Sequence, residues 1–503
     1  MLSIFDQGAP APCPSPFNLA AHVLAAGEAT PDKIALAILR VTGAERWSYA
    51  RLIAAVRGTA TGLLQTGLVP GDIMLLRLGN TVDFPIAYLG AIAAGIVPVP
   101  TSSQLTEREV APMIAALRPA AILRAESVAC PETDVPVHGP NTYTPWRDLP
   151  PAAYDMGDPD RLAYIIYTSG TSGLPRPVAH AHRAIWARQM MMEGWYGLRS
   201  TDRLLHAGAF NWTYTLGTGL MDPWTMGATA LIPVAGTDPA QLPLLMKRND
   251  ASIFAAAPGV YRQILKSSIP PLPKLRHGLA AGEKLAPTVR SAWQDATGTE
   301  IFEAFGMSEC STFISSAPDR PAAPEALGRP QAGRRVAILG DDGEPVPLGT
   351  PGTIAIDASD HGLMMGYHGA PDETAKRFTN GWFLTGDHGV MSESSEITYL
   401  GRGDDMMNAG GYRVSPIEVE AALADLPGIT EIGVTDVAIK DGVSIIAAFY
   451  LAPQELDEED LKDEAASRLA RYKQPRAFIR VDALPRNANG KLIRKALKDF
   501  AIS

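Results

Sequence analysis

Cysteine is scarce in this chain of 503 residues, with only three present. Cys13, Cys130 and Cys310 lie far apart and show no metal-ligand spacing, so neither a disulfide framework nor a cysteine metal site is expected. This usage favours the reducing cytoplasm as the location. No Lys or Arg precedes Lys33, and we therefore expect no secretory signal.

Long apolar runs are also missing from the sequence. The most membrane-like stretch, residues 84–100, contains 17 residues and is interrupted by Pro85, Gly90, Gly95 and Pro98. A helix that spans a bilayer needs about 20 predominantly apolar residues. The stretch instead predicts a buried helix followed by a strand, and we expect no integral membrane segment.

Basic residues are fewer than acidic residues in the whole chain. The chain has 44 basic and 54 acidic residues, a net charge of −10, which argues against a protein that binds nucleic acid through its backbone phosphates. Residues 461–503 differ, because they carry 11 basic and 4 acidic residues, a local net charge of +7 against −17 for the rest of the chain. This basic end is either a solvated surface or a module that meets a phosphorylated small molecule.

The organisation of the chain indicates an α/β protein. Its length allows about three units, and short apolar runs alternate with amphipathic stretches through the first four hundred residues, which predicts α/β layers with largely buried strands. Turn signals within residues 328–356 predict a small antiparallel or barrel-like part. A glycine-punctuated, charged segment at residues 401–405 predicts a hinge, and Ser415, Pro416 and Glu418 predict the start of a helix.

A loop rich in hydroxyls is the strongest local signal. Residues 167–176 read Tyr-Thr-Ser-Gly-Thr-Ser-Gly-Leu-Pro-Arg and follow a strand, so backbone amides and hydroxyls can approach an anion closely. The loop lacks the Gly-Lys-Ser/Thr ending of a Walker loop and the spacing of a serine-hydrolase elbow. Taken alone, it fits a phosphate-binding loop or a flexible surface loop.

Four further motifs follow it in order along the chain. They are Phe-Gly-Met-Ser-Glu at 305–309, Trp-Phe-Leu-Thr-Gly-Asp at 382–387, Gly-Arg-Gly-Asp-Asp at 401–405 and Pro-Arg-Asn-Ala-Asn-Gly-Lys at 485–491. With these five motifs the chain resembles the adenylate-forming superfamily of acyl-CoA synthetases, luciferases and peptide-synthetase adenylation domains, and most of all the benzoate-CoA ligases. The resemblance runs from about residue 17 to the end.

The resemblance implies an architecture and an activity. It implies a large N-terminal domain, residues 1–401, with two α/β subdomains and a small β-barrel-like part; a hinge at residues 402–405; and a smaller mobile α+β domain at residues 406–503. It implies an ATP- and Mg²⁺-dependent acid:CoA ligase, which forms an acyl-adenylate with release of pyrophosphate and then an acyl-CoA thioester with release of AMP. Its partners would be a carboxylic acid, ATP and CoA, and a homodimer is left open.

The resemblance also assigns roles to individual residues. Glu309 and Thr168 would hold Mg²⁺, Ser308 would contact a phosphate, and Lys491 would supply the cation for adenylation, with an effect of roughly 3 kcal/mol on the barrier. Asp387 and Arg402 would hold the ribose. The other residues expected to bind the nucleotide or CoA are Ser169, Gly170, Thr171, Ser172, Gly173, Gly282, Glu283, Phe305, Gly306, Gly410 and Gly411.

Hinge and acid pocket follow from the same resemblance. The small domain would rotate about Asp404, so that one active site serves both half-reactions. The acid would meet Trp212, Ala281 and Met307, which suggests a compact aryl or short- to medium-chain acid. No Asp occurs in residues 208–215, where relatives that activate amino acids anchor an ammonium group. This absence argues against a peptide-synthetase adenylation domain.

Departures from the family pattern leave two alternatives open. This chain has Arg176-Pro177 where many relatives have Lys-Gly, and it has Phe305 and Ser308 where many have Tyr and Thr. Proline removes an amide donor, and arginine keeps the charge in a different shape. An acyl-AMP ligase that loads a carrier protein is the first alternative, and a catalytically weakened nucleotide-binding protein is the second.

Overall fold

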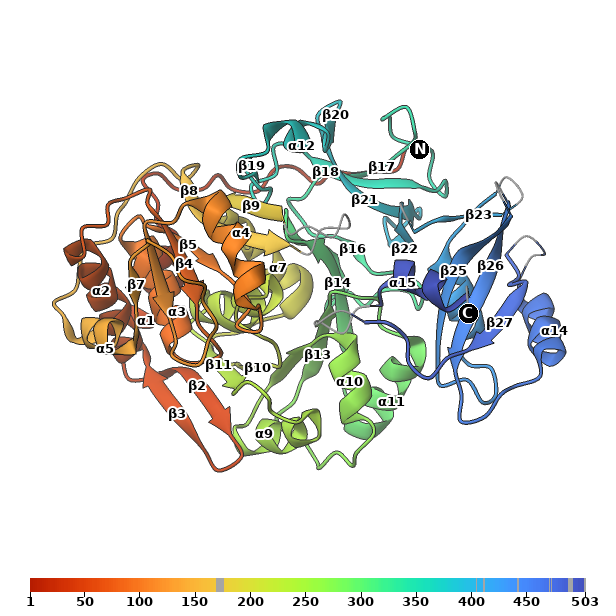
Figure 1. Cartoon of the computed structure of the whole chain (residues 1–503), viewed down its shortest axis with the longest axis horizontal. Coiled ribbons are helices and arrows are strands. Elements are labelled where there is room, and N and C mark those ends of the chain that lie inside the picture. The colour runs from red at the N-terminus through yellow and green to blue at the C-terminus, as the bar shows by residue number, and fades with distance from the viewer. Residues whose placement is uncertain are drawn as a thin grey trace.

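The computed structural model describes residues 1–168, 176–403, 405–409, 412–440, 443–469, 471, 473–486 and 492–501. These residues form a large N-terminal domain and a smaller C-terminal domain, which lies to the right in Figure 1. Four sheets build the large domain and two build the small one, within the residues described. The predicted α/β class is confirmed.

A nine-stranded mixed sheet forms the centre of the large domain. Its strands are, in spatial order, β16 (Arg329–Pro330), β15 (Ser311–Ser315), β14 (Ile301–Met307), β13 (His277–Ala281), β12 (Ile253–Ala256), β10 (Arg203–His206), β11 (Thr229–Pro233), β2 (Ile34–Arg40) and β3 (Gly43–Ser48). The six strands from β14 to β2 run parallel. Strand β12 is buried along its whole length, as expected for a parallel strand covered on both faces.

Helices cover both faces of this sheet. One core combines the sheet with α1 (Leu19–Glu28), α2 (Tyr49–Gln65), α3 (Asp83–Ala93) and α8 (Asp222–Thr225), and the other combines it with α9 (Leu242–Arg248), α10 (Pro258–Ile264) and α11 (Pro287–Thr297). Within β2, Leu36 and Ile38 pack in the first core, whereas Ala37 and Leu39 pack in the second. This alternation follows from the two-residue period of a strand.

Two smaller sheets form a second α/β unit of the large domain. A four-stranded parallel sheet contains β5 (Val97–Pro100), β4 (Ile73–Arg77), β6 (Ala121–Arg124) and β7 (Val137–His138). A three-stranded antiparallel sheet contains β19 (Gly366–Tyr367), β9 (Arg176–Ala181) and β8 (Leu162–Thr168). Leu75, Val99 and Ile165 join both sheets in one core, to which α4 (Glu107–Leu117) adds Val110. Because residues 84–100 form α3 and then β5, the predicted buried helix and strand are confirmed.

An antiparallel sheet closes the large domain near the C-terminal domain. It contains β1 (Ile4–Phe5), β17 (Val336–Leu339), β18 (Gly352–Asp357), β21 (Trp382–Met391) and β20 (Phe378–Thr379), and β22 (Ile397–Arg402) also pairs with β21. The antiparallel prediction is therefore right, but the described residues form no closed barrel. Turn signals predict hairpins, whereas closure requires the two edge strands to pair with each other, which no local signal encodes.

Two sheets and three α-helices are present in the described part of the C-terminal domain. Strands β23 (Met407–Ala409) and β24 (Tyr412–Val414) pair, and a second sheet contains β25 (Glu431–Lys440), β26 (Val443–Leu451) and β27 (Ala477–Arg480). Its helices are α13 (Pro416–Leu423), α14 (Glu458–Arg468) and α15 (Arg494–Leu497). The hydroxyl of Ser415 accepts a hydrogen bond from the backbone N–H of Glu418, which confirms the predicted helix start.

Short helices complete the described residues. They are α5 (Pro140–Tyr143), η1 (Pro145–Asp148), α6 (Ala184–Ala187), α7 (Gln189–Met191), η2 (Met192–Tyr196), η3 (Thr215–Met221), η4 (Pro239–Gln241), α12 (Pro371–Ala375) and η5 (Lys498–Ala501). Segments η2 and η3 are π-helices, which are rare and occur often at functional sites. Among the described helices, none has the length and apolar character needed to span a bilayer.

Candidate active site

A large cavity lies between the N-terminal and C-terminal domains. Its volume is about 990 Å³, and its walls come from strands β14, β21 and β22 and from the loop after β13 on one side, and from Glu420, Glu431, Arg486 and Arg494 on the other. The sequence-predicted residues that line it are Thr168, Trp212, Gly282, Glu283, Phe305, Gly306, Met307, Ser308, Glu309, Asp387 and Arg402. The fold thus brings together residues separated by more than two hundred positions.

Some predicted residues are placed elsewhere or are not described. Ala281 ends strand β13 and is buried in the same apolar cluster against which Trp212 packs, one residue before the cavity wall. The remaining predicted residues lie outside the described part of the chain: Ser169, Gly170, Thr171, Ser172, Gly173, Asp404, Gly410, Gly411 and Lys491. Thr168 and Arg176, which flank the hydroxyl-rich loop, are register partners in the β8–β9 pair.

The end of β14 delivers Ser308 and Glu309 to the cavity. A register shift in the β14–β15 pair falls between Phe305 and Gly306. A Cβ atom at Gly306 would lie 2.2 Å from the carbonyl oxygen of Ser311, so this close approach of two backbones requires glycine. Pairing continues after the bulge to Met307 and Ser311, and the next residues, Ser308 and Glu309, line the cavity. Bulges often occur beside functional sites, where they redirect side chains.

Glu309 has one neutral hydrogen-bond donor and little contact with water. Its side chain is buried, and its Oε1 accepts a hydrogen bond of 2.8 Å from the Tyr367 hydroxyl. Burial, together with the negative charge of Glu309, raises the pKa of Tyr367 to about 12, so the hydroxyl keeps its proton. The remaining carboxylate lone pairs at the cavity edge fit a hard cation such as Mg²⁺, which takes carboxylate and phosphate oxygens.

Arg176 lies next to the same tyrosine. Its guanidinium carbon is 5.5 Å from the centre of the Tyr367 ring, and its Nη2 is 3.9 Å from a carboxylate oxygen of Glu373. Arg176 lines the large cavity. The sequence departure at this position therefore keeps a positive charge at the cavity edge, close to the residue that holds Glu309.

Asp387 and Arg402 face each other across two strands. They are direct partners in the β21–β22 register. Oδ1 of Asp387 accepts a hydrogen bond of 2.9 Å from the hydroxyl of Tyr399, whose ring lies 5.5 Å from the ring of Phe305. Burial and the charge of Asp387 raise the pKa of Tyr399 well above its ordinary value, so it acts as a neutral donor. A fixed carboxylate beside a guanidinium suits the two hydroxyls of a ribose.

Glycine at position 282 is required by its backbone and by Trp212. Its φ angle is +99°, and a Cβ atom there would lie 3.1 Å from the Trp212 ring. The Trp212 ring also packs edge-on against Tyr214, with 5.1 Å between ring centres. The indole therefore forms a wall between Gly282 and the interior of the domain.

Glu283 joins the two domains. Its Oε1 lies 3.2 Å from Nη2 of Arg262 and accepts a hydrogen bond of 3.0 Å from the backbone of Gly259. Its Oε2 lies 3.8 Å from Nη1 of Arg486 in the C-terminal domain, and Arg486 also pairs with Glu431 at 2.7 Å. Glu283 therefore contacts one arginine of each domain, Arg262 and Arg486, at the cavity wall.

No spacing rule in the sequence predicts several of these contacts. Tyr367 lies 58 positions after Glu309, and Tyr399 donates to Asp387 from the neighbouring strand β22. A buried ion pair behind Ser311 joins Arg188, which lies between α6 and α7, to Asp222 at the start of α8. These contacts depend on how separate strands and helices pack, which only the fold supplies.

Comparisons with known proteins identify the family of both domains. The AMP-binding enzyme family model matches residues 23–368, and the AMP-binding enzyme C-terminal domain model matches residues 418–491. The 3-hydroxybenzoate–CoA ligase of Aromatoleum sp. (strain CIB) is 28% identical over 496 residues, which cover 92% of each chain. The mitochondrial acyl-coenzyme A synthetase ACSM1 of Mus musculus is 30% identical over 90% of this chain and 85% of that protein.

Solved structures give the same result for the fold. The crystal structure of ATP-bound MatB from Rhodopseudomonas palustris matches with a TM-score of 0.87 and 25% identity, over 96% of this chain and 99% of that one. Both family models together extend over most of the chain, and they follow the order of the two domains described above. The chain therefore belongs to the AMP-binding enzymes of the adenylate-forming superfamily, whose acid:CoA ligases use ATP, Mg²⁺ and CoA.

Proposed function

We propose that this AMP-forming acid–thiol ligase activates a compact aryl carboxylic acid, with short- and medium-chain acids as the alternative substrates. The observation that carries the proposal is the single cavity of about 990 Å³ lined by Thr168, Glu309, Asp387 and Arg402. The relative named for 3-hydroxybenzoate supports an aryl acid, and the one named acyl-coenzyme A synthetase supports the alternative.

In the first half-reaction a carboxylate oxygen attacks the α-phosphorus of ATP, and pyrophosphate leaves. We assign Asp387 and Arg402 to the ribose, and Glu309 with Thr168 to Mg²⁺, because the Glu309 carboxylate reaches the cavity with one neutral donor. Mg²⁺ at this position would offset the negative charge of the phosphates. Ser308 would donate its hydroxyl to a phosphate oxygen, and Lys491 would place its ammonium near the developing charge.

In the second half-reaction the thiolate of CoA attacks the carbonyl carbon of the acyl-adenylate, and AMP leaves. We propose that the C-terminal domain, residues 406–503, rotates relative to residues 1–401 about Asp404 within the segment 402–405. This rotation would withdraw Lys491 and bring Gly410 and Gly411 toward the cavity, where residues without side chains admit the thin pantetheine arm.

The acid would enter on the side of Met307. Met307 and Ser308 line both the large cavity and a small cavity behind them, and Trp212 and Gly282 stand at the adjoining wall. An acid whose carboxylate points to Ser308 and Glu309 would therefore rest its other end against Met307. The small volume of the second cavity, about 30 Å³, supports a compact acid over a long acyl chain.

Product analysis with purified chain tests the proposal. AMP, pyrophosphate and thioester are measured over a panel of aryl and aliphatic carboxylic acids, each with and without CoA. AMP release that depends on CoA and matches thioester formation supports the ligase. Adenylate without a CoA thioester would favour a ligase that loads a carrier protein, and no turnover on the whole panel would favour a weakened nucleotide-binding protein.

A cytoplasmic location is part of the same proposal. Cys13, Cys130 and Cys310 are all unpaired thiols, and the latter two are buried, which fits a reducing compartment. Cell fractionation with an antibody against the chain checks the location.

A further inference from the structure

A small cavity with a mixed polar and apolar lining lies directly behind the proposed acid position. Its volume is about 30 Å³. Its polar lining residues are Tyr164, His180, Arg188, Thr213, Ser308 and Ser311, and its apolar side chains are Ile166, Ala184, Leu216, Met221 and Met307. Met307 and Ser308 also line the large cavity. A space of roughly 10–15 Å³ by such a measure is needed for one water molecule. The cavity therefore accepts one or two small polar groups and has no room for an aromatic ring.

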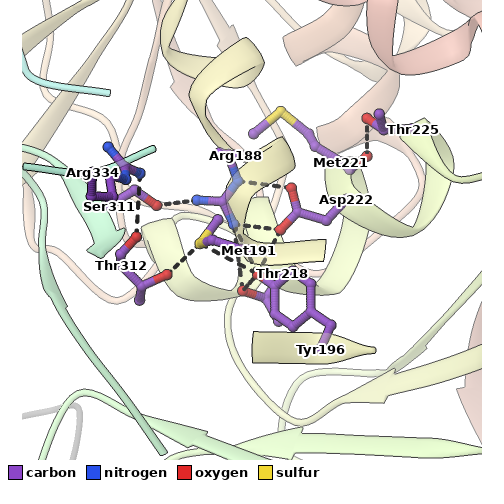
Figure 2. Close-up of polar contacts among 10 residues, drawn as sticks. All are labelled: Arg188, Met191, Tyr196, Thr218, Met221, Asp222, Thr225, Ser311, Thr312 and Arg334. Carbon is purple, nitrogen blue, oxygen red and sulfur yellow. Dashed lines mark hydrogen bonds and ion pairs between the residues drawn. The ribbon is translucent and has the colours of Figure 1, made fainter. Parts of the chain in front are cut away.

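Arg188 forms the charged side of this cavity. Its side chain is 9% exposed and that of Asp222 is fully buried. Nε of Arg188 donates to Oδ1 of Asp222 at 2.8 Å, Nη2 donates to Oδ2 at 2.5 Å, and the Tyr196 hydroxyl donates to the same Oδ2 at 2.7 Å (Figure 2). Burial alone would lower the pKa of Arg188, but the Asp222 carboxylate raises it above its ordinary value. The pair is thus fully ionised and has no net charge.

The other edge of the guanidinium faces Ser311. Figure 2 shows Nη1 of Arg188 pointing to the Ser311 hydroxyl, on the side opposite Asp222, and Ser311 accepts a hydrogen bond from it. Arginine has five N–H groups. Nε and Nη2 are directed to Asp222, Tyr196 and Thr218, whereas Nη1 has Ser311 as its one partner among the described residues, which leaves one N–H of Nη1 for a further acceptor.

His180 supplies the complementary acceptor. Its Nε2 lies 2.7 Å from the carbonyl oxygen of Ser308, and this contact requires an N–H at Nε2, so Nδ1 carries a lone pair. Nδ1 is buried and has no partner among the residues that the structure describes. Desolvation lowers the pKa of His180 to about 4, so the ring is neutral near pH 7. The His180 ring stacks on Tyr164 with 5.0 Å between ring centres.

We propose that the acid activated by this enzyme carries a neutral hydroxyl group at the end away from its carboxylate, and that Arg188 is the residue that selects it. This inference rests on the proposed function. A hydroxyl can accept from Arg188 and donate to His180, which line the same small cavity. An apolar end would leave one N–H of Arg188 and Nδ1 of His180 without an acceptor and a donor, respectively, which costs free energy because both atoms are buried.

A second carboxylate is disfavoured by charge and by size. Asp222 already neutralises Arg188, so a buried anion would find no unpaired cation in this cavity. A carboxylate, with three non-hydrogen atoms, also needs more of this cavity of about 30 Å³ than a hydroxyl does. Tyr196 and Thr218, which contact the Arg188–Asp222 pair, lie on the π-helices η2 and η3. The π-helix is a rare conformation that often occurs at functional sites.

Matched acids test the proposal on the unmodified enzyme. We would measure kcat/KM for thioester formation with 3-hydroxybenzoate, 4-hydroxybenzoate, the two fluorobenzoates at the same positions, benzoate, and the dicarboxylates isophthalate and terephthalate. We expect one hydroxybenzoate to exceed both benzoate and its fluoro analogue by roughly ten- to hundredfold, because fluorine matches the size of a hydroxyl but cannot donate.

A pair of substitutions tests the role of Arg188. Arg188→Met with Asp222→Leu removes both charges and keeps the volume, which avoids an unpaired buried charge. We expect the ratio of kcat/KM between the hydroxybenzoate and its fluoro analogue to fall close to one. Arg276→Met with Asp202→Leu removes a similar ion pair, 2.7 Å between Nη2 and Oδ2, that lines neither cavity, and should keep the wild-type ratio.

Each outcome decides one statement. If thioester forms equally well from hydroxylated and fluorinated acids, or best from a dicarboxylate, the hydroxyl proposal is wrong while the ligase function stands. If the double variant keeps the wild-type ratio, Arg188 is not the selecting residue. If no acid gives a thioester, the proposed function itself fails. The wild-type ratio needs no variant, so the proposal stays testable even if the double variant does not fold.

Discussion

Replacement of Tyr367 by phenylalanine should weaken the use of Mg²⁺ by the enzyme. The change removes one hydroxyl, which donates to Oε1 of Glu309 at 2.8 Å, and keeps the ring beneath Arg176. Glu309 is only 8% exposed, so water cannot readily replace the lost donor. A hydrogen bond to a charged group contributes about 1.5–3 kcal/mol.

That free energy corresponds to a loss of Mg²⁺ affinity of roughly ten- to hundredfold, which is the usual effect of removing a group that orients a metal ligand. The assay is acid-dependent exchange of pyrophosphate into ATP, measured at a series of Mg²⁺ concentrations with wild type and Tyr367→Phe. We expect half-maximal exchange to require more Mg²⁺ in the variant, by a factor within that range.

A matched control separates orientation of Glu309 from loss of stability. The Tyr261 hydroxyl is also buried and donates to backbone carbonyls at 3.0 and 3.1 Å, and Tyr261 does not line the large cavity. Tyr261→Phe should lower the unfolding temperature without changing the Mg²⁺ dependence. The reasoning is refuted if Tyr367→Phe shows the wild-type Mg²⁺ dependence, or if both variants shift it equally.

Three further changes have definite expected results. Gly282→Ala places a Cβ atom on a residue with φ +99°, 3.1 Å from the Trp212 ring, so we expect about 1–2 kcal/mol of strain. The variant should have a lower unfolding temperature and a higher KM for the acid, and an unchanged KM would contradict this. Lys491→Ala should abolish adenylate formation but spare thioester formation from supplied acyl-adenylate, and equal loss of both rates would contradict the two-step assignment. Burial lowers the pKa of His180 to about 4 and of His206 to about 3, from 6.5 in the unfolded chain. The unfolded chain therefore binds protons first as the pH falls, and each histidine lowers the free energy of unfolding by about 1.4 kcal/mol per unit between pH 6.5 and 4. Urea titrations across this pH range check that the free energy of unfolding falls as the pH falls. For His206→Gln we expect a smaller change in that free energy per pH unit.

Much of the fold could be predicted from local patterns. The cap at Ser415, the buried helix and strand within residues 84–100, and the α/β rhythm each depend on neighbours within a few positions. The ordered motifs also pointed to residues that the fold brings together, since Glu309 and Asp387 line one cavity.

Contacts between segments far apart in the sequence could not be predicted in this way. Tyr367 lies 58 positions from Glu309, and Arg188 lies 34 positions from Asp222, with no spacing rule that links either pair. The difference between a closed barrel and the open antiparallel sheet depends on whether edge strands pair, and the hairpin signals are identical in both. The contacts that orient Glu309 and Arg188 are therefore the part of the site that needed the structure.

The double ion pair of Arg486 affects how easily the C-terminal domain can rotate. In a rotation that separates Arg486 from Glu283, Arg486 keeps Glu431 of its own domain at 2.7 Å, and Glu283 keeps Arg262 at 3.2 Å. Neither charge is stranded, and the contact that breaks is a 3.8 Å pair between partly exposed side chains, of the kind that contributes at most about 1 kcal/mol. In the rotation that we propose, breaking this one pair therefore has a small electrostatic cost, and added salt should reduce that cost further.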